Sequence, residues 1–244
     1  MSPDSAADPG RRLIIALDYS HLEPALDIAQ AVGARVGLLK VGLELFNSVG
    51  PRAIQELRAA GHEVFYDAKL YDIPNTTERA AAAAGRLGVS MLNVHCLGGL
   101  AVMRAAKEGA ARGAAEAGMP PPIVIGVTII TSIGEAELAE QLGLRDGLSA
   151  TVRRLALLAR EAGLDGVVAS VHEVRDIKQA CGDDFLTVTP GVRPIWARAG
   201  DQARVATPRQ ALEVGADYLV IGRPITGAED PRAALERIVA EMSA

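Results

Sequence analysis

Short apolar segments alternate along this chain with longer segments that carry apolar residues at helical spacing. The first apolar segment covers residues 13–18 (LIIALD), and residues 21–32 after it have the pattern of an amphipathic helix. Apolar segments without polar alternation are typical of strands that are buried on both faces, as in a parallel sheet. Parallel strands need crossover connections, which helices commonly supply, so the pattern predicts repeated strand–helix units.

The alternation continues to the end of the chain and predicts eight strand–helix units. Strands are expected at residues 13–18, 35–41, 63–69, 90–95, 122–128, 165–170, 185–189 and 217–221. The helices after them are expected at residues 21–32, from the second strand to about 60, 76–87, 100–116, within 147–162, 173–179, 208–213 and 231–242. Eight units in about 250 residues, with no Pro/Ser-rich linker to divide them, favour an α/β fold of the single-domain (β/α)8 TIM barrel type. We expect the barrel to span residues 12–244 and residues 1–11 to be a flexible N-terminal tail.

Two connecting segments are longer than simple connectors need to be. One covers residues 131–146 after the fifth predicted strand, and the other covers residues 191–204 (GVRPIWARAGDQAR) after the seventh. Long loops in compact domains are often functional. In a (β/α)8 barrel, the loops that follow the strands form the face on which the active site lies.

Composition limits the classes of partner and compartment. Of the 244 residues 49% are hydrophobic, which is enough for a large core, and the net charge of −5 argues against nucleic acid or an anionic membrane as the main partner. No apolar run approaches the ~20 residues of a membrane span, and the polar N-terminus lacks the apolar centre of a signal peptide. Cys96 and Cys181 are too few for a disulfide framework or a zinc cluster, so we expect reduced thiols in a cytoplasmic protein.

The third predicted strand ends in charged residues. Asp67 and Lys69 share one face of the strand, because side chains alternate with a period of two, and Asp72 follows just beyond it. In a barrel strand one face points inward, where a charged pair is costly to bury unless it is paired and hydrogen-bonded. A structural ion pair at a strand end is one interpretation, and a catalytic site is the other.

The first two predicted strands also end in charged residues. Asp18 ends the first strand and Lys40 lies at the end of the second. Taken alone, Asp18 is compatible with a helix N-cap and Lys40 with a surface residue. Together with Asp67 and Lys69, they place four alternating charges at one mouth of the barrel, which favours a functional site.

The loops after the seventh and eighth predicted strands carry the pattern of a phosphate site. Gly191-Val192-Arg193 follows the seventh strand and Gly222-Arg223 follows the eighth. TIM barrels frequently bind phosphate through these two loops. Glycine permits close approach of the backbone, and arginine suits bidentate binding of phosphate. Each Gly-Arg pair is a weak signal by itself, but both at these positions predict phosphate binding.

With these residues, the chain resembles the bacterial orotidine 5'-phosphate decarboxylases over residues 13–238. Residues 67–76 (DAKLYDIPNT) are similar to the family signature D-x-K-x-x-D-I-P-x-T. Further matching segments are ALD ending at Asp18, LKVG around Lys40, NVH ending at His95, VTIITS ending at Ser132, TPGVR ending at Arg193, GDQ ending at Gln202 and IGRPIT around Arg223. Each segment is modest alone, but their order and spacing together are specific.

The resemblance implies a reaction and an assembly. The activity is decarboxylation of orotidine 5'-phosphate to UMP, the last step of de novo pyrimidine nucleotide biosynthesis, with no metal and no organic cofactor. Lys69 would stabilise the carbanion at C6 of the pyrimidine and then protonate it, with Asp67, Asp72 and Lys40 as the other members of the catalytic group. The resemblance also implies a homodimer in which Asp72 reaches into the site of the second subunit.

The resemblance further implies a role for each binding position. Asp18 and Lys40 would hold the ribose, Thr131 or Ser132 the pyrimidine edge, and Gln202 would bridge pyrimidine and phosphate. The complete set of expected substrate-binding residues is Asp18, Lys40, Asp67, Lys69, Asp72, Ile73, Thr76, Thr131, Ser132, Arg193, Gln202, Gly222 and Arg223. Arg193 and Arg223 would bind the phosphate.

Two alternatives remain at this point. The magnesium-dependent 3-keto-gulonate 6-phosphate decarboxylases and hexulose phosphate synthases share the D-x-K-x-x-D pattern, but they lack the pyrimidine-binding segment and the long phosphate loop with its glutamine. Thr131-Ser132 and residues 200–202 (GDQ) therefore favour the nucleotide substrate. The second alternative is a non-catalytic barrel that only binds a phosphorylated metabolite, and Lys69 with both aspartates argues against it.

Overall fold

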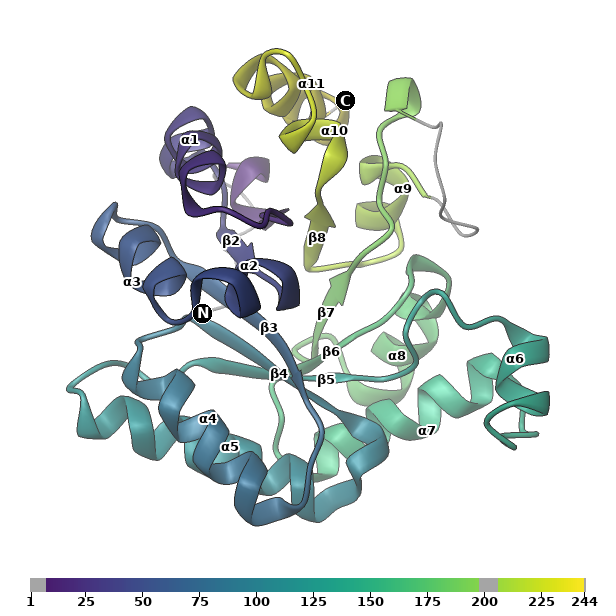
Figure 1. Cartoon of the computed structure of the whole chain (residues 1–244). Helices are drawn as coiled ribbons and strands as arrows, with labels where there is room; N and C mark the ends of the chain where they lie inside the picture. The colour runs from purple at the N-terminus through teal and green to yellow at the C-terminus, as the bar shows by residue number, and fades with distance from the viewer. Residues whose placement is uncertain (1–7, 198–205, 244) are drawn as a thin grey trace.

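The computed structural model describes residues 8–197 and 206–243. Within these residues, eight parallel strands form a closed barrel in chain order, because β1 pairs with β2 and also with β8 (Figure 1). The strands are β1 (Leu13–Ala16), β2 (Leu38–Val41), β3 (Val64–Leu70), β4 (Met91–His95), β5 (Ile123–Val127), β6 (Gly166–Val168), β7 (Leu186–Thr189) and β8 (Tyr218–Ile221). The predicted (β/α)8 barrel is confirmed.

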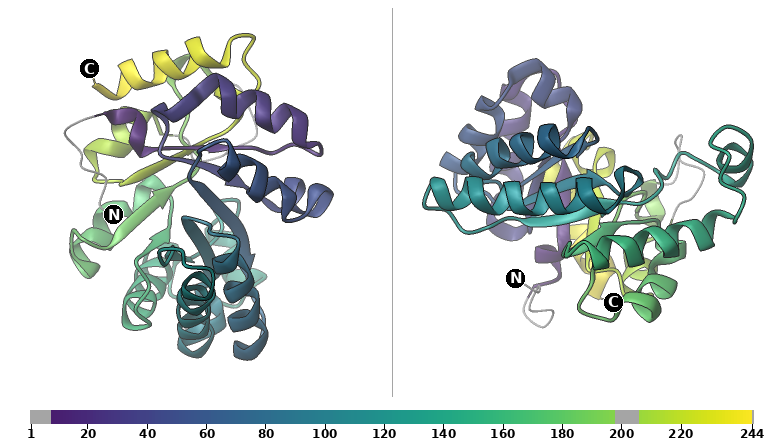
Figure 2. Two further views of the ribbon diagram at one scale, coloured as in Figure 1. Left: turned by 90° about the vertical axis from the view of Figure 1, so that its left-hand side faces the viewer. Right: turned by 90° about the horizontal axis from the view of Figure 1, so that it is seen from below.

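Helices surround the barrel and connect successive strands. In the described part of the chain they are α1 (Leu22–Val32), α2 (Leu43–Val49), α3 (Arg52–Ala59), α4 (Pro74–Arg86), α5 (Gly99–Glu116), α6 (Glu135–Glu140), α7 (Leu148–Glu161), α8 (Val174–Cys181), α9 (Pro208–Glu213), α10 (Arg223–Thr226) and α11 (Pro231–Ser243). Helices α1 and α11 contact each other, so the two ends of the chain close the outer ring (Figure 2). None of the helices described is long and apolar enough to cross a membrane.

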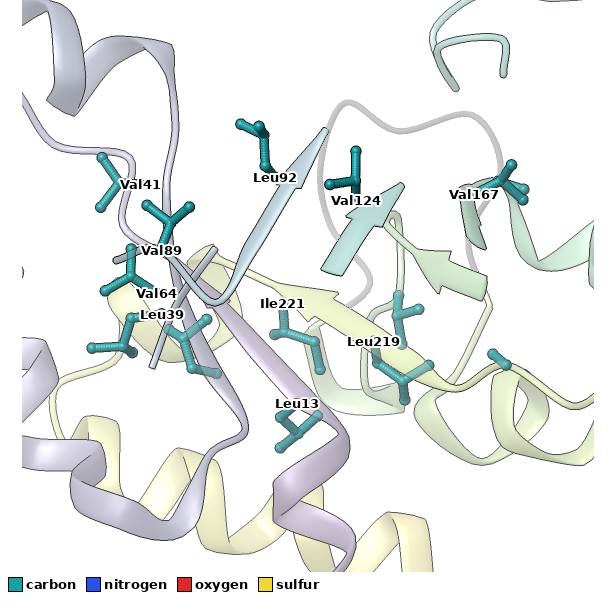
Figure 3. Packing of buried hydrophobic residues seen from close by; sticks show 14 of the residues in the cluster. Leu13, Leu39, Val41, Val64, Val89, Leu92, Val124, Val167, Leu219 and Ile221 are labelled. Carbon is teal, nitrogen blue, oxygen red and sulfur yellow. The ribbon is translucent and has the colours of Figure 1, made fainter. Parts of the chain in front are cut away.

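Side-chain alternation along each strand separates two regions of the core. One set of strand residues packs outward against the helices, as Leu13, Leu39 and Leu219 do in Figure 3. The other set comes only from strands and fills the barrel interior: Ile14, Leu38, Phe65, Met91, Ile125, Leu186, Val188 and Tyr218. Residues two positions further along β2, β3 and β4 from this interior set are Lys40, Asp67 and Asn93. The inward face therefore changes from apolar to polar at the carboxyl ends of the strands.

Several helix boundaries differ from the sequence predictions. The single helix expected up to about residue 60 is two helices, because Gly50 adopts a φ of 74° at the end of α2 and Pro51 follows it. The segment 131–146, expected as a long loop, contains the short helix α6. A further short helix, α10, begins at Arg223 directly after β8.

Part of the segment that was expected as a flexible tail lies within the described structure and is helical. Pro9–Arg12 forms a 3-10 helix, although the flexible tail was expected to run to residue 11. The Arg11 guanidinium donates to the carbonyls of Ala34 and Val36, and Arg12 donates to those of Ala216 and Asp217. These carbonyls lie just before β2 and β8, so the two arginines fasten this segment to the amino end of the barrel. Residues 1–7 lie outside the described part of the chain.

Helices α4 and α5 lie side by side at very short range (Figure 1). A Cβ atom added to Gly85 would lie 2.3 Å from the carbonyl oxygen of Ala110, and one added to Gly113 would lie 1.9 Å from that of Ala82. Such distances are impossible without a backbone shift, so glycine is required at this contact. The contact matters for the site because α4 begins at Pro74, two residues after Asp72.

Candidate active site

A cavity of about 300 Å³ opens at the carboxyl ends of the strands. Every strand of the barrel contributes at least one residue to its lining, either from the strand itself or from the loop that follows. This is the face on which (β/α)8 barrels carry their active sites. Among the predicted site residues, the lining includes Asp18, Lys40, Asp67, Lys69, Thr131, Arg193, Gly222 and Arg223.

Four charged side chains form a continuous chain along one side of this cavity. The Lys40 ammonium lies 3.2 Å from a carboxylate oxygen of Asp18 and 3.3 Å from Oδ2 of Asp67. The other carboxylate oxygen of Asp67, Oδ1, accepts a 2.7 Å hydrogen bond from the Lys69 ammonium. Asp67 therefore bridges the two lysines, and the order around the mouth is Asp18, Lys40, Asp67 and Lys69.

Asp67 is the most constrained member of this charged chain. Only 8% of the residue is exposed. Burial by itself raises the pKa of the Asp67 carboxyl, but the two lysine ammonium groups and the hydrogen bonds from Lys69 and Asn93 outweigh it, so the pKa lies below its ordinary value. The carboxylate is therefore ionised at neutral pH and holds both lysines in place.

Lys69 has an unusual backbone conformation. Its φ is 48°, and it is the one non-glycine residue with a positive φ in the part of the chain that the structure describes. The pairing of β3 with β4 shifts register between Tyr66 and Leu70, so β3 carries a bulge at this point. Bulges next to active sites often redirect a side chain, and the Lys69 side chain at this bulge lines the cavity.

Asn93 is a site residue that the sequence analysis missed. It lies on β4 and is 1% exposed. Its side-chain oxygen accepts a 2.7 Å hydrogen bond from the Lys69 backbone N–H, and its side-chain nitrogen donates at 2.6 Å to Oδ1 of Asp67. The sequence did contain a signal for this role: Asn93 is a polar residue within the apolar part of β4, at a position whose side chain points inward.

His95, at the end of β4, lies beside this group. Burial lowers the pKa of His95, and the charge of Lys69 lowers it further against the opposing effect of Asp67. The imidazole is therefore neutral at neutral pH. Its ring packs against Tyr71 with a centroid separation of 5.4 Å, so it supports the segment that leads to Asp72.

The predicted phosphate residues lie across the mouth from Lys69. Strand β3 is separated from β7 by three strands in either direction around the barrel. Arg193 follows β7 and is 7% exposed, and its backbone N–H donates to the carbonyl of Ala206. Arg223 begins α10, with Gly222 at the helix N-cap. The two arginines therefore approach one cavity from adjacent strand ends.

Other predicted residues lie outside the cavity of their own chain. Asp72, Ile73 and Thr76 are exposed, and in the described structure none of them lines the cavity. One Asp72 oxygen accepts a 2.7 Å hydrogen bond from the N–H of Ile73. Ser132 is also exposed and absent from the described lining, whereas its neighbour Thr131 belongs to it. Gln202 lies outside the described residues.

The residue types at the site favour binding by charge and hydrogen bonds. No group of three or more His, Cys, Asp or Glu side chains in the described residues is arranged to hold a metal ion. Cys96 and Cys181 are both buried and unpaired. The described groups can hold an anion on the arginine side and present a fixed ammonium on the Lys69 side.

Comparison with known proteins gives the family. Residues 11–238 match the model of the "Orotidine 5'-phosphate decarboxylase / HUMPS family". The chain belongs to this family. The name of this family covers both the orotidine 5'-phosphate decarboxylases and the sugar-phosphate enzymes that the sequence analysis kept as an alternative. The individual relatives therefore indicate which of these two groups the chain is more similar to.

Named relatives in the family cover nearly the whole chain. The orotidine 5'-phosphate decarboxylase of Heliobacterium modesticaldum is 48% identical over 232 residues, which are 95% of this chain and 96% of the relative. That of Moorella thermoacetica is 48% identical, with 95% and 92% covered. The crystal structure of the Lactobacillus acidophilus orotidine 5'-phosphate decarboxylase has 39% identity and a TM-score of 0.85, and the alignment covers 96% of this chain and 100% of that one.

Proposed function

We propose that this protein decarboxylates orotidine 5'-phosphate to UMP and CO₂. The observation that carries the proposal is the Asp18–Lys40–Asp67–Lys69 chain, with Arg193 on the other side of the same cavity. The bacterial relatives at 48% identity that carry this activity in their names support it. The product is the pyrimidine nucleotide UMP, and the reaction would complete its de novo synthesis.

The substrate is expected to span the cavity from the arginines to Lys69. Arg193, Arg223 and the backbone at Gly222 would bind the phosphate, because planar guanidinium groups match phosphate oxygens in pairs. Asp18 and Lys40 would bind the ribose hydroxyls. Thr131 and Ser132 would contact the pyrimidine edge, and Gln202 would connect pyrimidine and phosphate.

Lys69 would carry the chemical step. The bond between C6 and the carboxylate carbon breaks, CO₂ leaves, and the electron pair stays on C6 in the plane of the ring. A proton from the Lys69 ammonium then forms the new C6–H bond. Enzymes typically lower barriers by about 8–23 kcal/mol, and a cation fixed before the reaction stabilises the developing anion without reorganisation. The 2.7 Å contact with Asp67 supports such a fixed position.

Asp67 would act on both lysines and on the substrate. Its lowered pKa keeps it ionised, so both ammonium groups retain a buried counter-ion. Bound substrate would place its own carboxylate near Asp67, and the loss of CO₂ would relieve that repulsion. Stabilisation of the transition state by Lys69 remains the main element of the proposal.

The proposal includes a homodimer that shares Asp72. Asp72 is exposed between two exposed apolar side chains, Tyr71 at 62% and Ile73 at 65%. Apolar side chains around a charged group suit a surface that a second copy covers. The four charged side chains of the cavity contain two carboxylates and two ammonium groups. Asp72 of the second copy would add a third carboxylate, which would also hold Lys69. Ile73 and Thr76 would contribute from the same segment.

The remaining expectations concern cofactor and compartment. We expect turnover without metal or organic cofactor, because Lys69 would provide both the cation and the proton. The two unpaired, buried thiols support a reducing compartment, so we place the enzyme in the cytoplasm.

The test is an absorbance assay with orotidine 5'-phosphate in the presence of EDTA. We expect loss of the substrate absorbance at a rate that added Mg²⁺ does not change. Absence of turnover with this substrate, together with Mg²⁺-dependent conversion of 3-keto-gulonate 6-phosphate, would assign the chain to the other branch of the family.

A further inference from the structure

The bulge in β3 leaves the backbone near the charged group without its regular partners. Tyr66 pairs with Leu92 and Leu70 pairs with Val94, so three residues of β3 lie opposite the single residue Asn93 on β4. One residue of β4 cannot form the regular backbone hydrogen bonds of a parallel sheet with three residues of β3. The Lys69 N–H instead donates to the side-chain oxygen of Asn93, at 2.7 Å. The amide side chain therefore replaces a missing backbone acceptor.

The other end of the same amide holds the carboxylate. The Asn93 side-chain nitrogen donates to Oδ1 of Asp67 at 2.6 Å, and the Lys69 ammonium donates to that same oxygen at 2.7 Å. The contacts close a ring that runs from the Lys69 backbone through Asn93 and Asp67 to the Lys69 side chain. A left-handed φ of 48° is unfavourable for lysine, so this conformation needs a specific partner.

We propose that Asn93 is a positioning residue that aims Lys69: its side-chain amide fixes both the Lys69 backbone and the carboxylate that holds the Lys69 ammonium. The inference rests on the proposed function and goes beyond it, because Asn93 acts through Asp67 and Lys69. The role requires a donor and an acceptor on one short neutral side chain. Leucine has neither, and aspartate would place a second negative charge against Asp67.

The position of Asn93 predicts an effect on the chemical step and little effect on substrate capture. Arg193 and Arg223 come from the ends of β7 and β8, across the mouth from β4. Asn93→Ala should therefore lower kcat about 10- to 100-fold, the effect of losing a buried hydrogen bond to a charged group, with KM changed by about threefold or less. A residue that only supports the fold would not separate the two constants in this way.

Asn93→Asp gives a second readout through pH. It keeps the shape and the acceptor for the Lys69 N–H, but the donor to Asp67 is replaced by a carboxylate. Two carboxylates in contact hold a shared proton more tightly than either alone, and the protonated form restores the donor. The ratio of variant to wild-type kcat should therefore rise as the pH falls from about 8 toward about 5.

A matched control separates positioning from simple destabilisation. Leu92→Ala removes a fully buried side chain next to Asn93 on the same strand, on the opposite face. It should lower the melting temperature at least as much as Asn93→Ala, yet keep kcat near the wild-type value at temperatures where it is folded. Equal loss of kcat in the two variants would overturn the inference, as would a kcat ratio for Asn93→Asp that does not vary with pH.

A crystal structure of Asn93→Ala makes the inference independent of activity. We expect the Lys69 φ to leave the left-handed region and its ammonium to move away from Asp67. An unchanged Lys69 would show that Asn93 does not position it. The wild-type protein, assayed in parallel with orotidine 5'-phosphate, tests the proposed function alone. Absence of wild-type turnover would refute the proposed function, whereas an unchanged Lys69 in the Asn93→Ala crystal structure would refute the positioning role.

Discussion

Asp67→Asn tests the centre of the charged chain, because it removes one charge and keeps the shape. Asp67 uses both carboxylate oxygens: Oδ1 accepts from Lys69 and Asn93, and Oδ2 faces Lys40 at 3.3 Å. An asparagine has only one oxygen. In either orientation of its side chain, the amide NH₂ group faces a donor, so at least one of the contacts becomes a clash between donors.

The expected loss of stability follows from burial and the remaining partners. Removing one partner of a buried ion pair costs about 3–5 kcal/mol. Lys40 keeps Asp18 at 3.2 Å, and the Lys69 side chain is 34% exposed to water. Both lysines are therefore partly compensated, and we expect a loss of about 2–3 kcal/mol. For a domain of this size, that corresponds to a fall of about 4–12 °C in Tm.

The expected loss of activity is larger than the loss of stability. Two contacts to the Asp67 charge orient the lysines, and each charge-assisted hydrogen bond is worth about 1.5–3 kcal/mol. Removing both should lower kcat by about 10²–10⁴-fold. Binding of UMP, measured by calorimetry, should be retained, because Arg193 and Arg223 lie across the cavity. A kcat within tenfold of wild type and an unchanged Tm would refute the reasoning.

The same variant has a defined pH signature. Because folding lowers the pKa of Asp67, its ionised form stabilises the fold above the ordinary carboxyl pKa of about 3.9. That contribution is lost as the pH falls through the lowered pKa. Asp67→Asn lacks it at every pH, so the difference in unfolding free energy between the two proteins should be constant near neutrality and shrink below about pH 4. Denaturant unfolding at a series of pH values measures this difference.

Four further substitutions test the rest of the site and the fold. Lys69→Ala should abolish nearly all turnover while circular dichroism shows a folded barrel, because it removes both the cation and the proton donor; near-normal kcat would exclude the mechanism. Arg223→Ala should lower kcat/KM for orotidine 5'-phosphate more than tenfold, since a charged phosphate contact is worth about 1.5–3 kcal/mol, but scarcely affect the phosphate-free nucleoside orotidine. Lys69→Ala and Asp72→Asn chains refolded together should regain about a quarter of wild-type activity through mixed dimers with one intact site, and no gain despite confirmed mixed dimers would place Asp72 in its own site. Gly113→Ala should destabilise the protein by about 1–3 kcal/mol in thermal unfolding, because its Cβ would meet the Ala82 backbone; an unchanged Tm would show that α4 and α5 can separate.

The sequence by itself determined the barrel and the side of it that carries the chemistry. Alternating apolar and helical segments predicted all of the strands in the structure, since each pattern depends on residues close together in the chain. The period of two placed Asp67 and Lys69 on one inward face, and strand ends placed Asp18 and Lys40 beside them. Local patterns are sufficient for these conclusions because the barrel order follows the chain order.

The tertiary structure decided how those residues meet. The break at Gly50, the helical segment at residues 9–12 and the close contact at Gly113 each depend on a neighbour that is distant in sequence or on a single backbone angle. The bulge in β3 depends on its register against β4, which no pattern within β3 encodes. Asn93 acquires its partners only when that register is set, because the amide has its acceptor on the oxygen and its donors on the nitrogen, and the bulge brings Lys69 to the first and Asp67 to the second.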